Sequence, residues 1–240
     1  MRRAAVFAVM LLAAPAHAQS YAVTTTVTVE EWVEAGAERL VATHAPAPPD
    51  GKAYGPFRVL DEHRAALVDA TDAASPGAFR AMLRDHPGIA AIEMIECPGT
   101  DDDTANLALG RMIRAARIAT HVPANGSVRS GAVELFLAGA VRSIDDGAEF
   151  AVHAWRDSDG REPGDFARHS AVNRAYLDYY RQMGLADAQA FYDMTNTVPN
   201  AEARWLTAQD MRRWIGEAKD GDVTVPAPSI AYLDLGTRFP

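Results

Sequence analysis

Three short stretches of the sequence carry residues that could act together on a carbonyl group. Pro98-Gly99 follows one apolar run, Ser130-Gly131 precedes a second, and His153 ends a third. A serine hydroxyl is a weak nucleophile, which a histidine activates by taking its proton. Backbone N–H groups at glycines can stabilise the oxyanion that such an attack creates. These residue types predict acyl-transfer chemistry.

Each stretch also has a purely structural interpretation. A serine at a helix start is most often an N-cap, which is the alternative role for Ser130. The segment Glu96–Thr100 could be an ordinary turn from a strand into a helix. His153 could be a polar group satisfied at a strand end, and Cys97 a small buried apolar residue. The local sequence leaves these alternatives open.

Apolar runs and turn signals predict the elements that must position these residues. Short apolar runs are typical of buried strands, and apolar residues at helical spacing indicate helices. We expect strands at Tyr21–Trp32, Phe57–Leu60, Ile89–Glu96, Ile118–Val122, Glu149–His153, Asp222–Pro226 and Ile230–Leu235. We expect helices at Ser75–His86, Asp101–Arg117, Ser130–Ala140, Phe166–Met183, Asp187–Met194 and Thr207–Ala218. Strands that alternate with helices in short steps indicate an α/β fold with a mostly parallel sheet.

Turn and cap residues divide these elements. Ser75 is expected to cap its helix, with Pro76 in the first turn, and Thr207 to cap the last helix. The Pro/Gly-rich stretch Ala45–Gly55 and the polar stretch Asp157–Asp165 are expected to be loops.

Composition excludes several classes of function. The chain has 240 residues, 48% of them hydrophobic, which is enough for a sizeable core. It has 32 acidic and 23 basic residues, and a net charge of -9 argues against nucleic acid or an anionic membrane surface as the partner. Cys97 is the single cysteine, so an intrachain disulfide and a thiolate zinc cluster are excluded. Since nucleotide-binding and HExxH motifs are missing, we expect no cofactor and no metal.

Two acidic stretches could suggest a cation site. Asp101–Asp103 is better explained as a complement to the dipole of the helix that it begins. Asp157–Gly160 resembles the start of a calcium loop, but the rest of that pattern is missing.

The first residues predict an export signal. Two arginines precede an apolar stretch over residues 4–14, and Ala16-His17-Ala18 has the small-x-small pattern of a signal peptidase site. The apolar stretch is shorter than the about 20 residues that cross a bilayer. We expect cleavage after Ala18 and a periplasmic or extracellular protein that is not an integral membrane protein. Loss of residues 1–18 would change the net charge to -11.

The order and spacing of the motifs carry a family resemblance. Pro98-Gly99 is followed by Ser130, by Gly139 nine residues later, and by His153 23 residues after the serine. This set resembles the Clp-protease-like serine peptidases of the ClpP/crotonase superfamily. In that family a Pro-Gly turn supplies part of the oxyanion hole, a serine begins a helix that ends in Ala-Gly, and a histidine ends the next strand.

Exported bacterial members of this superfamily, often labelled alpha/beta hydrolases, are more closely similar. They share stretches that correspond here to Ser130–Gly139, Val152–Trp155, Tyr176–Tyr180 and Phe191–Tyr192, and Trp205–Ala208 resembles a further family segment. The resemblance covers about Phe57 to Gly216. A true alpha/beta-hydrolase nucleophile elbow is disfavoured, because position 128 is valine where GxSxG requires glycine.

The resemblance implies a fold, an activity and site residues. The fold would be a ClpP/crotonase-like spiral of β-β-α units with C-terminal helices. It would occupy residues 57–240, after a signal peptide over 1–18 and an N-terminal strand and loop segment over 19–56. The protein would be an exported serine hydrolase, which we expect to be a peptidase. Ser130 would form the acyl-enzyme, His153 would be the general base, and the N–H groups of Gly99 and Gly131 would form the oxyanion hole.

The third member of the triad departs from the family pattern. Ala203 stands where the family usually has an aspartate. Asn200, Glu202 and Asp193 are nearby candidates, and a neutral side chain such as asparagine can orient a catalytic histidine. Because this aspartate is missing, a catalytically silent binding or assembly module is an alternative function. Crotonase-type acyl-thioester chemistry is a less favoured one, since coenzyme A thioesters are intracellular.

The resemblance also implies partners. The substrate would be a peptide or a small acyl compound, and the chain is expected to form a homo-oligomer, as the superfamily commonly does. The substrate itself cannot be read from the motifs.

Overall fold

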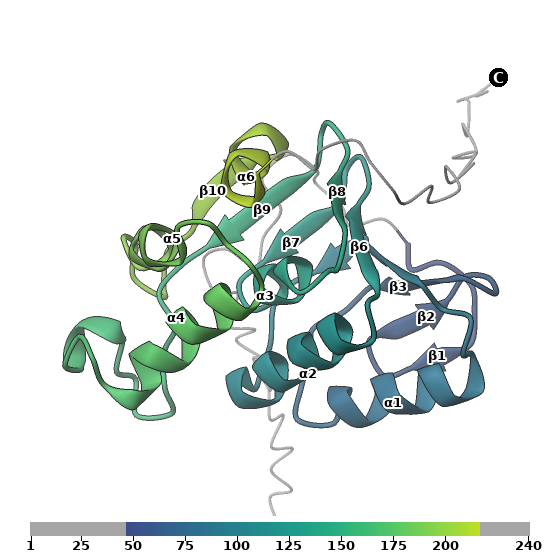
Figure 1. Ribbon diagram of the computed structural model, residues 1–240, viewed down its shortest axis with the longest axis horizontal. Coiled ribbons are helices and arrows are strands. Elements are labelled where there is room, and N and C mark those ends of the chain that lie inside the picture. The colour runs from purple at the N-terminus through teal and green to yellow at the C-terminus, as the bar shows by residue number, and fades with distance from the viewer. Residues whose placement is uncertain (1–46, 217–240) are drawn as a thin grey trace, which may run out of the picture. The chain divides into compact units, whose positions relative to one another are not determined.

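The computed structural model describes residues 47–216, which form two β-sheets and their covering helices (Figure 1). The larger sheet has the strand order β1 (Ala53–Tyr54), β2 (Phe57–Val59), β3 (Arg64–Leu67), β4 (Ala91–Met94), β6 (Ala119–Val122) and β8 (Arg142–Ile144). The smaller sheet has the order β10 (Arg204–Thr207), β9 (Glu149–Val152), β7 (Ser127–Arg129) and β5 (Glu96–Cys97).

Six α-helices and one short 3-10 helix accompany the sheets. The helices are α1 (Ser75–Asp85), α2 (Asp103–Ala115), α3 (Ala132–Leu137), α4 (Ala171–Gln182), α5 (Ala188–Thr195) and α6 (Ala208–Ile215), and the 3-10 helix is η1 (Pro163–Asp165). Figure 1 shows α1 beside β1 and β2, whereas α5 and α6 lie near the smaller sheet. None of these helices has both the length and the apolar character that a membrane crossing requires.

Most strand pairs are parallel. β3, β4, β6 and β8 pair in parallel, and so do β5, β7 and β9. The antiparallel pairs are β1 with β2, β2 with β3, and β9 with β10. The fold is therefore α/β with mostly parallel pairing, as the sequence predicted, although the strands are divided between two sheets.

The predicted strand Ile89–Glu96 is in fact two strands that belong to different sheets. Ile95 lies between β4 and β5. Its N–H donates to the carbonyl oxygen of Leu67 (3.1 Å), and its own carbonyl accepts from the N–H of Ser127 (3.0 Å). One residue thus bonds to both sheets, and the chain passes from the larger sheet into the one that carries Ser130.

The other differences from the predicted elements concern short or charged segments. The strands β3, β7, β8 and β10 were not predicted, and the predicted loop Ala45–Gly55 contains β1. Ser75 begins α1 without capping it, because its hydroxyl bonds to Asp72 instead. Thr207 does cap α6, as predicted. The predicted strands Tyr21–Trp32, Asp222–Pro226 and Ile230–Leu235 and the signal peptide lie outside the described residues.

Aromatic residues join α3 to the smaller sheet and α4 to α5. The Phe136 ring of α3 lies 5.2 Å from the Phe150 ring of β9, and the Tyr180 ring of α4 lies 5.0 Å from the Phe191 ring of α5. All four residues are buried. Such ring pairs stabilise a core beyond the area that they bury, so the first pair holds α3 against the sheet and the second holds α4 against α5.

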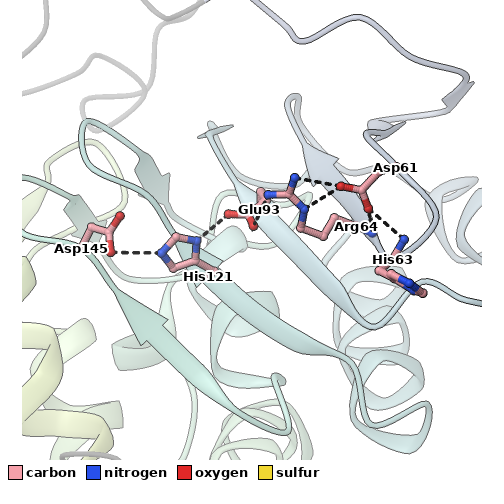
Figure 2. A network of polar contacts seen from close by, with 6 residues as sticks. All are labelled: Asp61, His63, Arg64, Glu93, His121 and Asp145. Atoms are coloured by element: carbon pink, nitrogen blue, oxygen red, sulfur yellow. Dashed lines mark hydrogen bonds and ion pairs between the residues drawn. The ribbon is translucent and has the colours of Figure 1, made fainter. Parts of the chain in front are cut away.

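A chain of charged side chains crosses the larger sheet (Figure 2). Glu93, 2% exposed, accepts from Nδ1 of His121 at 2.5 Å, and Nε2 of His121 lies 3.2 Å from Asp145 Oδ1. Arg64 lies 3.8 Å from Glu93 and is also paired with Asp61. Burial alone would lower the pKa of His121, but Glu93 and Asp145 outweigh it and raise that pKa. We call these five residues the sheet charge chain.

Candidate active site

Ser130 and His153 lie at the same edge of the smaller sheet. Ser130 follows β7 and His153 follows β9, and these two strands are parallel neighbours with Arg129 opposite Ala151. In open α/β sheets, ligands bind outside the carboxyl ends of parallel strands. Both residues line a pocket of about 790 Å³, which α2, α3, α4 and α5 also border. The structure brings them together without a hydrogen bond between them, and such bonds are often long before a substrate binds.

Ser130 has an uncommon backbone conformation. Its φ is 49°, in the left-handed region that few residues other than glycine adopt. Its N–H donates to the carbonyl oxygen of Ala151 (2.9 Å). The N-cap of α3 is Gly131, which makes no side-chain cap, so the interpretation of Ser130 as an ordinary cap is wrong. Strained residues of this kind gather at functional sites.

Gly99 packs directly against Ser130. It has a φ of 140°, and a Cβ atom there would lie 2.9 Å from Ser130 Cβ and 3.3 Å from Ser130 Oγ. Its carbonyl oxygen accepts from the N–H of Thr71 (3.0 Å), which fixes the peptide plane. A side chain at position 99 would therefore occupy the space beside the hydroxyl.

Gly131 is fixed in the same way on the other side of Ser130. A Cβ atom there would lie 2.4 Å from Cγ2 of Thr100. Its carbonyl oxygen accepts from Nδ2 of Asn106 (2.6 Å), and Asn106 in turn accepts from the Thr71 hydroxyl (2.9 Å). Neither Gly99 nor Gly131 uses its N–H in a backbone hydrogen bond within residues 47–216. Both N–H groups are available to an oxyanion.

Asn200 is the candidate third residue that lies beside His153. It is 5% exposed, its Nδ2 lies 3.1 Å from His153 Nδ1, and Nδ2 donates to the carbonyl oxygen of Ala154 (3.0 Å). Its N–H donates to Glu162 (2.8 Å). The other two candidates, Glu202 and Asp193, are exposed. Asp193 is bonded to Gln189 and paired with Arg168.

The carbonyl of Ala154 and the amide of Asn200 both lie against Nδ1 of His153. The carbonyl oxygen lies 2.9 Å from Nδ1 of His153. A carbonyl oxygen can only accept, so this contact favours a proton on Nδ1, whereas the Nδ2 donor of Asn200 at 3.1 Å would suit an unprotonated Nδ1. A proton on Nδ1 leaves the lone pair on Nε2. This is the tautomer that a general base for Ser130 requires. In that tautomer the orienting group is a backbone carbonyl that Asn200 also contacts.

A buried polar row supports β7 from behind, and the sequence analysis missed it. Glu96, Ser127 and Glu149 lie opposite one another across β5, β7 and β9. Ser127 Oγ donates to Glu149 (2.8 Å) and accepts from Arg129 (2.6 Å), and Arg129 pairs with Glu96. Charged residues within short strands were the available signal. The row holds β7, which Ser130 follows, in register with β5 and β9.

Glu134 is a second feature that sequence reasoning missed. It lies one turn after Ser130 on α3, is 8% exposed, and lines the pocket. Its Oε1 accepts from the Tyr180 hydroxyl (2.5 Å). Burial raises the pKa of Glu134 to about 7. A carboxyl group that is costly to charge therefore faces the pocket, and its i+4 spacing from Ser130 was the only signal in the sequence.

Neither acidic stretch forms a metal centre in the described part of the chain. Residues 47–216 contain no group of three or more His, Cys, Asp or Glu side chains arranged to hold a metal ion. Asp102 accepts from the N–H of Ala105 and caps α2. The carboxylate of Asp157 is engaged by Arg161. Cys97 is buried at the end of β5, as expected of a structural cysteine.

Comparison with known proteins identifies structural neighbours only. No family model and no curated protein matches the chain. Two of the similar solved structures are mutants of 1510-N membrane-bound stomatin-specific protease. One, in complex with a substrate peptide, is 14% identical, covers 62% of this chain and 69% of its own, and has a TM-score of 0.43. The other is 12% identical, with coverages of 62% and 73% and a TM-score of 0.44. At TM-scores below 0.5 this likeness carries no functional argument, so function must be inferred from the pocket.

Proposed function

We propose that the chain is a serine hydrolase of the ClpP/crotonase type, and specifically a peptidase. The observation that carries this proposal is the contact between Gly99 and Ser130. A strained serine lies between two glycines with available N–H groups, in the same pocket as a histidine. A merely structural serine would need neither this conformation nor this open space.

The proposed reaction begins with attack of Ser130 Oγ on the carbonyl carbon of the substrate. Nε2 of His153 takes the hydroxyl proton, and the N–H groups of Gly99 and Gly131 bind the oxyanion. His153 then returns the proton to the leaving amine as the C–N bond breaks. Water, deprotonated by the same nitrogen, attacks the acyl-enzyme and releases the acid and the free serine.

Ala154 and Asn200 would act as positioning groups in this scheme. The carbonyl of Ala154 accepts from Nδ1 and so stabilises the imidazolium that forms during attack. Because a carbonyl is neutral, it stabilises that cation less than a carboxylate would. We therefore propose a slower enzyme than one with a complete Ser-His-Asp triad.

The place of action is part of the proposal. The N-terminal pattern supports export after cleavage at Ala18, into the periplasm or outside the cell. N-terminal sequencing of the protein recovered from cell fractions tests this. Recovery of an uncleaved chain in the cytoplasmic fraction would contradict it.

Covalent labelling tests the proposed nucleophile. We expect the purified chain to react with a fluorophosphonate probe, and the Ser130→Ala variant not to react. Ser158→Ala is the matched control, because Ser158 is an exposed serine that lines the same pocket. It should label normally. Equal labelling of wild type and Ser130→Ala would contradict the proposal.

A catalytically silent binding module is the second candidate function. Two observations favour it: the missing Ser130–His153 hydrogen bond, and Ala203 at the position of the family's aspartate. Asn200→Asp would place a carboxylate beside His153. If the fluorophosphonate probe labels Asn200→Asp but not wild type, the chain lacks only the group that orients His153, and the catalytically silent module is the correct function.

A further inference from the structure

The inner wall of the pocket has features that the proposed reaction does not use. The inference drawn from them rests on the proposed function, because it concerns what the same pocket would bind. Glu134 forms part of this wall, with Tyr180 as the one side-chain hydrogen-bond partner of its carboxyl group in the described chain. Desolvating a carboxyl group costs free energy unless a partner compensates for it. A hydrogen-bond donor or a cation at this point would offset part of that cost.

Tyr176 adds an independent observation. It is 7% exposed and lines the pocket. Its hydroxyl lies close enough to Asp103 for that carboxylate to act on its pKa, yet it makes no hydrogen bond of ordinary geometry among the described residues. Buried polar atoms without partners are rare, and each calls for an explanation such as a ligand. Burial first, and then the charge of Asp103, raises the pKa of Tyr176 well above its usual value. Its hydroxyl is thus a neutral group that can accept a hydrogen bond from a ligand.

Aromatic rings surround these two polar groups. The rings of Trp155 and Tyr176 are stacked at 6.0 Å, and the ring of Tyr192 lies 6.4 Å from those of Tyr176 and Tyr180. All four residues line the pocket. Trp155 and Tyr192 satisfy each other, because the indole N–H donates to the Tyr192 hydroxyl (3.1 Å). Faces of such rings attract cations, most strongly where water is excluded.

The charges that border the pocket have mostly one sign. Asp101, Asp102 and Asp103 lie at its wall at the start of α2, although Asp102 serves as the helix cap. Arg156 is the one arginine or lysine that lines the pocket in the described part of the chain. It is exposed and has interactions of its own. The field inside the pocket therefore favours a cation over an anion.

We propose that this wall is the specificity pocket for a substrate with a basic side chain, whose cationic group pairs with the carboxylate of Glu134 and donates to the Tyr176 hydroxyl. A lysine-like ammonium has three donors and no acceptor, so it suits two acceptors and an aromatic wall. Because it pairs with a buried carboxyl, binding displaces the proton of Glu134 near neutral pH.

Binding measurements on a hydrolytically inactive protein test this proposal. In the Ser130→Ala background, titration calorimetry compares a short lysine-containing peptide with the same peptide carrying norleucine. We expect the lysine peptide to bind about tenfold more tightly, the size of one charged hydrogen-bonded contact. Glu134→Gln should remove that preference while leaving the norleucine peptide within twofold. Proton release, seen as a dependence of the heat on buffer, should disappear in the same variant.

Two further variants keep the test informative. Tyr176→Phe removes only the hydroxyl and should weaken lysine binding by a smaller factor. Asp159→Asn removes an exposed carboxylate that pairs with Arg161 outside the pocket, and it should change nothing. Equal binding of the two peptides, or an equal loss of both in Glu134→Gln, would overturn the inference. A lysine preference without any hydrolysis by wild type would instead contradict only the proposed function.

Discussion

Two clusters of polar side chains, each of which includes a buried carboxyl group, differ in how their members are paired. In the sheet charge chain, His121 bridges Glu93 and Asp145, and Arg64 lies between Glu93 and Asp61 (Figure 2), so every member is in an ion pair although Nη1 of Arg64 makes no hydrogen bond among the described residues. In the pocket, the Tyr176 hydroxyl and the Oδ1 atom of Asn200 have no hydrogen-bond partner among the described residues, and Ser130 has a strained backbone.

The two regions differ in how far charge pairing compensates for the burial of a carboxyl group. Satisfied buried networks make a fold rigid and specific, whereas partly satisfied ones cost stability. Proteins retain such costs where function needs them. Substitutions in the charge chain should therefore change stability and leave chemistry intact. Substitutions in the pocket should change chemistry, and those that remove a charge that is costly to bury should also stabilise the fold.

The largest expected effect is on catalysis at Ser130. Once a turnover assay exists, Ser130→Ala should lower kcat by about a thousandfold or more, as removal of a serine nucleophile does. Its free energy of unfolding should stay within about 0.5 kcal/mol of wild type, since the hydroxyl makes no hydrogen bond in the described structure. Denaturant unfolding checks the second value. If Ser130→Ala loses stability as well as activity, the proposed difference between the pocket and the sheet charge chain is wrong.

The charge chain should give the largest stability effect. His121→Leu leaves the buried carboxylate of Glu93 with only the distant Arg64, and we expect a loss of about 3 kcal/mol at pH 6. The pKa of His121 is raised in the folded state, so its contribution is complete below its unfolded pKa. It is lost as pH rises through the folded pKa. Unfolding curves from pH 5 to 8 measure this dependence of the free energy of unfolding on pH. Adding Glu93→Gln to His121→Leu should recover part of the lost stability. A pH-independent loss would contradict it.

Substitution of Glu134 should raise the free energy of unfolding, whereas substitution of His121 should lower it. Its folded pKa of about 7 exceeds its ordinary value, so the folded state binds the proton more tightly than the unfolded state. Stability is then lost as pH rises from the unfolded pKa through about 7. Glu134→Gln, which cannot ionise, should gain at most about 3 kcal/mol at pH 8 and almost nothing below pH 4.5. Paired unfolding curves measure the gain, and a loss at pH 8 would show that the carboxylate is structural.

The smallest effect is expected at Asn200. Asn200→Ala removes the side chain that contacts His153 and the Ala154 carbonyl, but it leaves that carbonyl in place. We expect kcat/KM to fall about tenfold, the usual cost of losing one orienting hydrogen bond. Steady-state kinetics with a matched melting curve check this. An unchanged rate would assign orientation to the carbonyl alone.

The sequence predicted what depends on local chemistry and missed what depends on pairing between distant strands. Thr207 and its Asp210 form a capping box that is visible in the sequence, and α6 begins there. The run Ile89–Glu96 is apolar throughout, so nothing local shows that Ile95 divides it between two sheets. The strand β7, Ser-Val-Arg, is too short and too polar to be recognised in the sequence. Its buried charge, Arg129, is neutralised by Glu96 on the neighbouring strand, and local sequence does not show that pairing.

The site was predicted in the same uneven way. The resemblance named Ser130, His153 and Asn200, and the structure brings the first two into one pocket with Asn200 beside His153. The resemblance named Gly99, whose contact with Ser130 depends on its positive φ. All residues of α3 are buried, so the spacing of its apolar residues does not show that Glu134 is buried as well. The carbonyl of Ala154 has no sequence signal, because every residue has one.

Ile95 has a consequence for how the molecule opens. Its peptide groups bond to Leu67 in one sheet and to Ser127 in the other. A local fluctuation that separates β5 from β7 therefore also strains the end of β4, so the two sheets should unfold as one cooperative unit. In hydrogen exchange, the amides of Ile95 and Ser127 would then share one opening free energy. Gly99 lies four residues farther along the chain, and its position against Ser130 would persist until that unit opens.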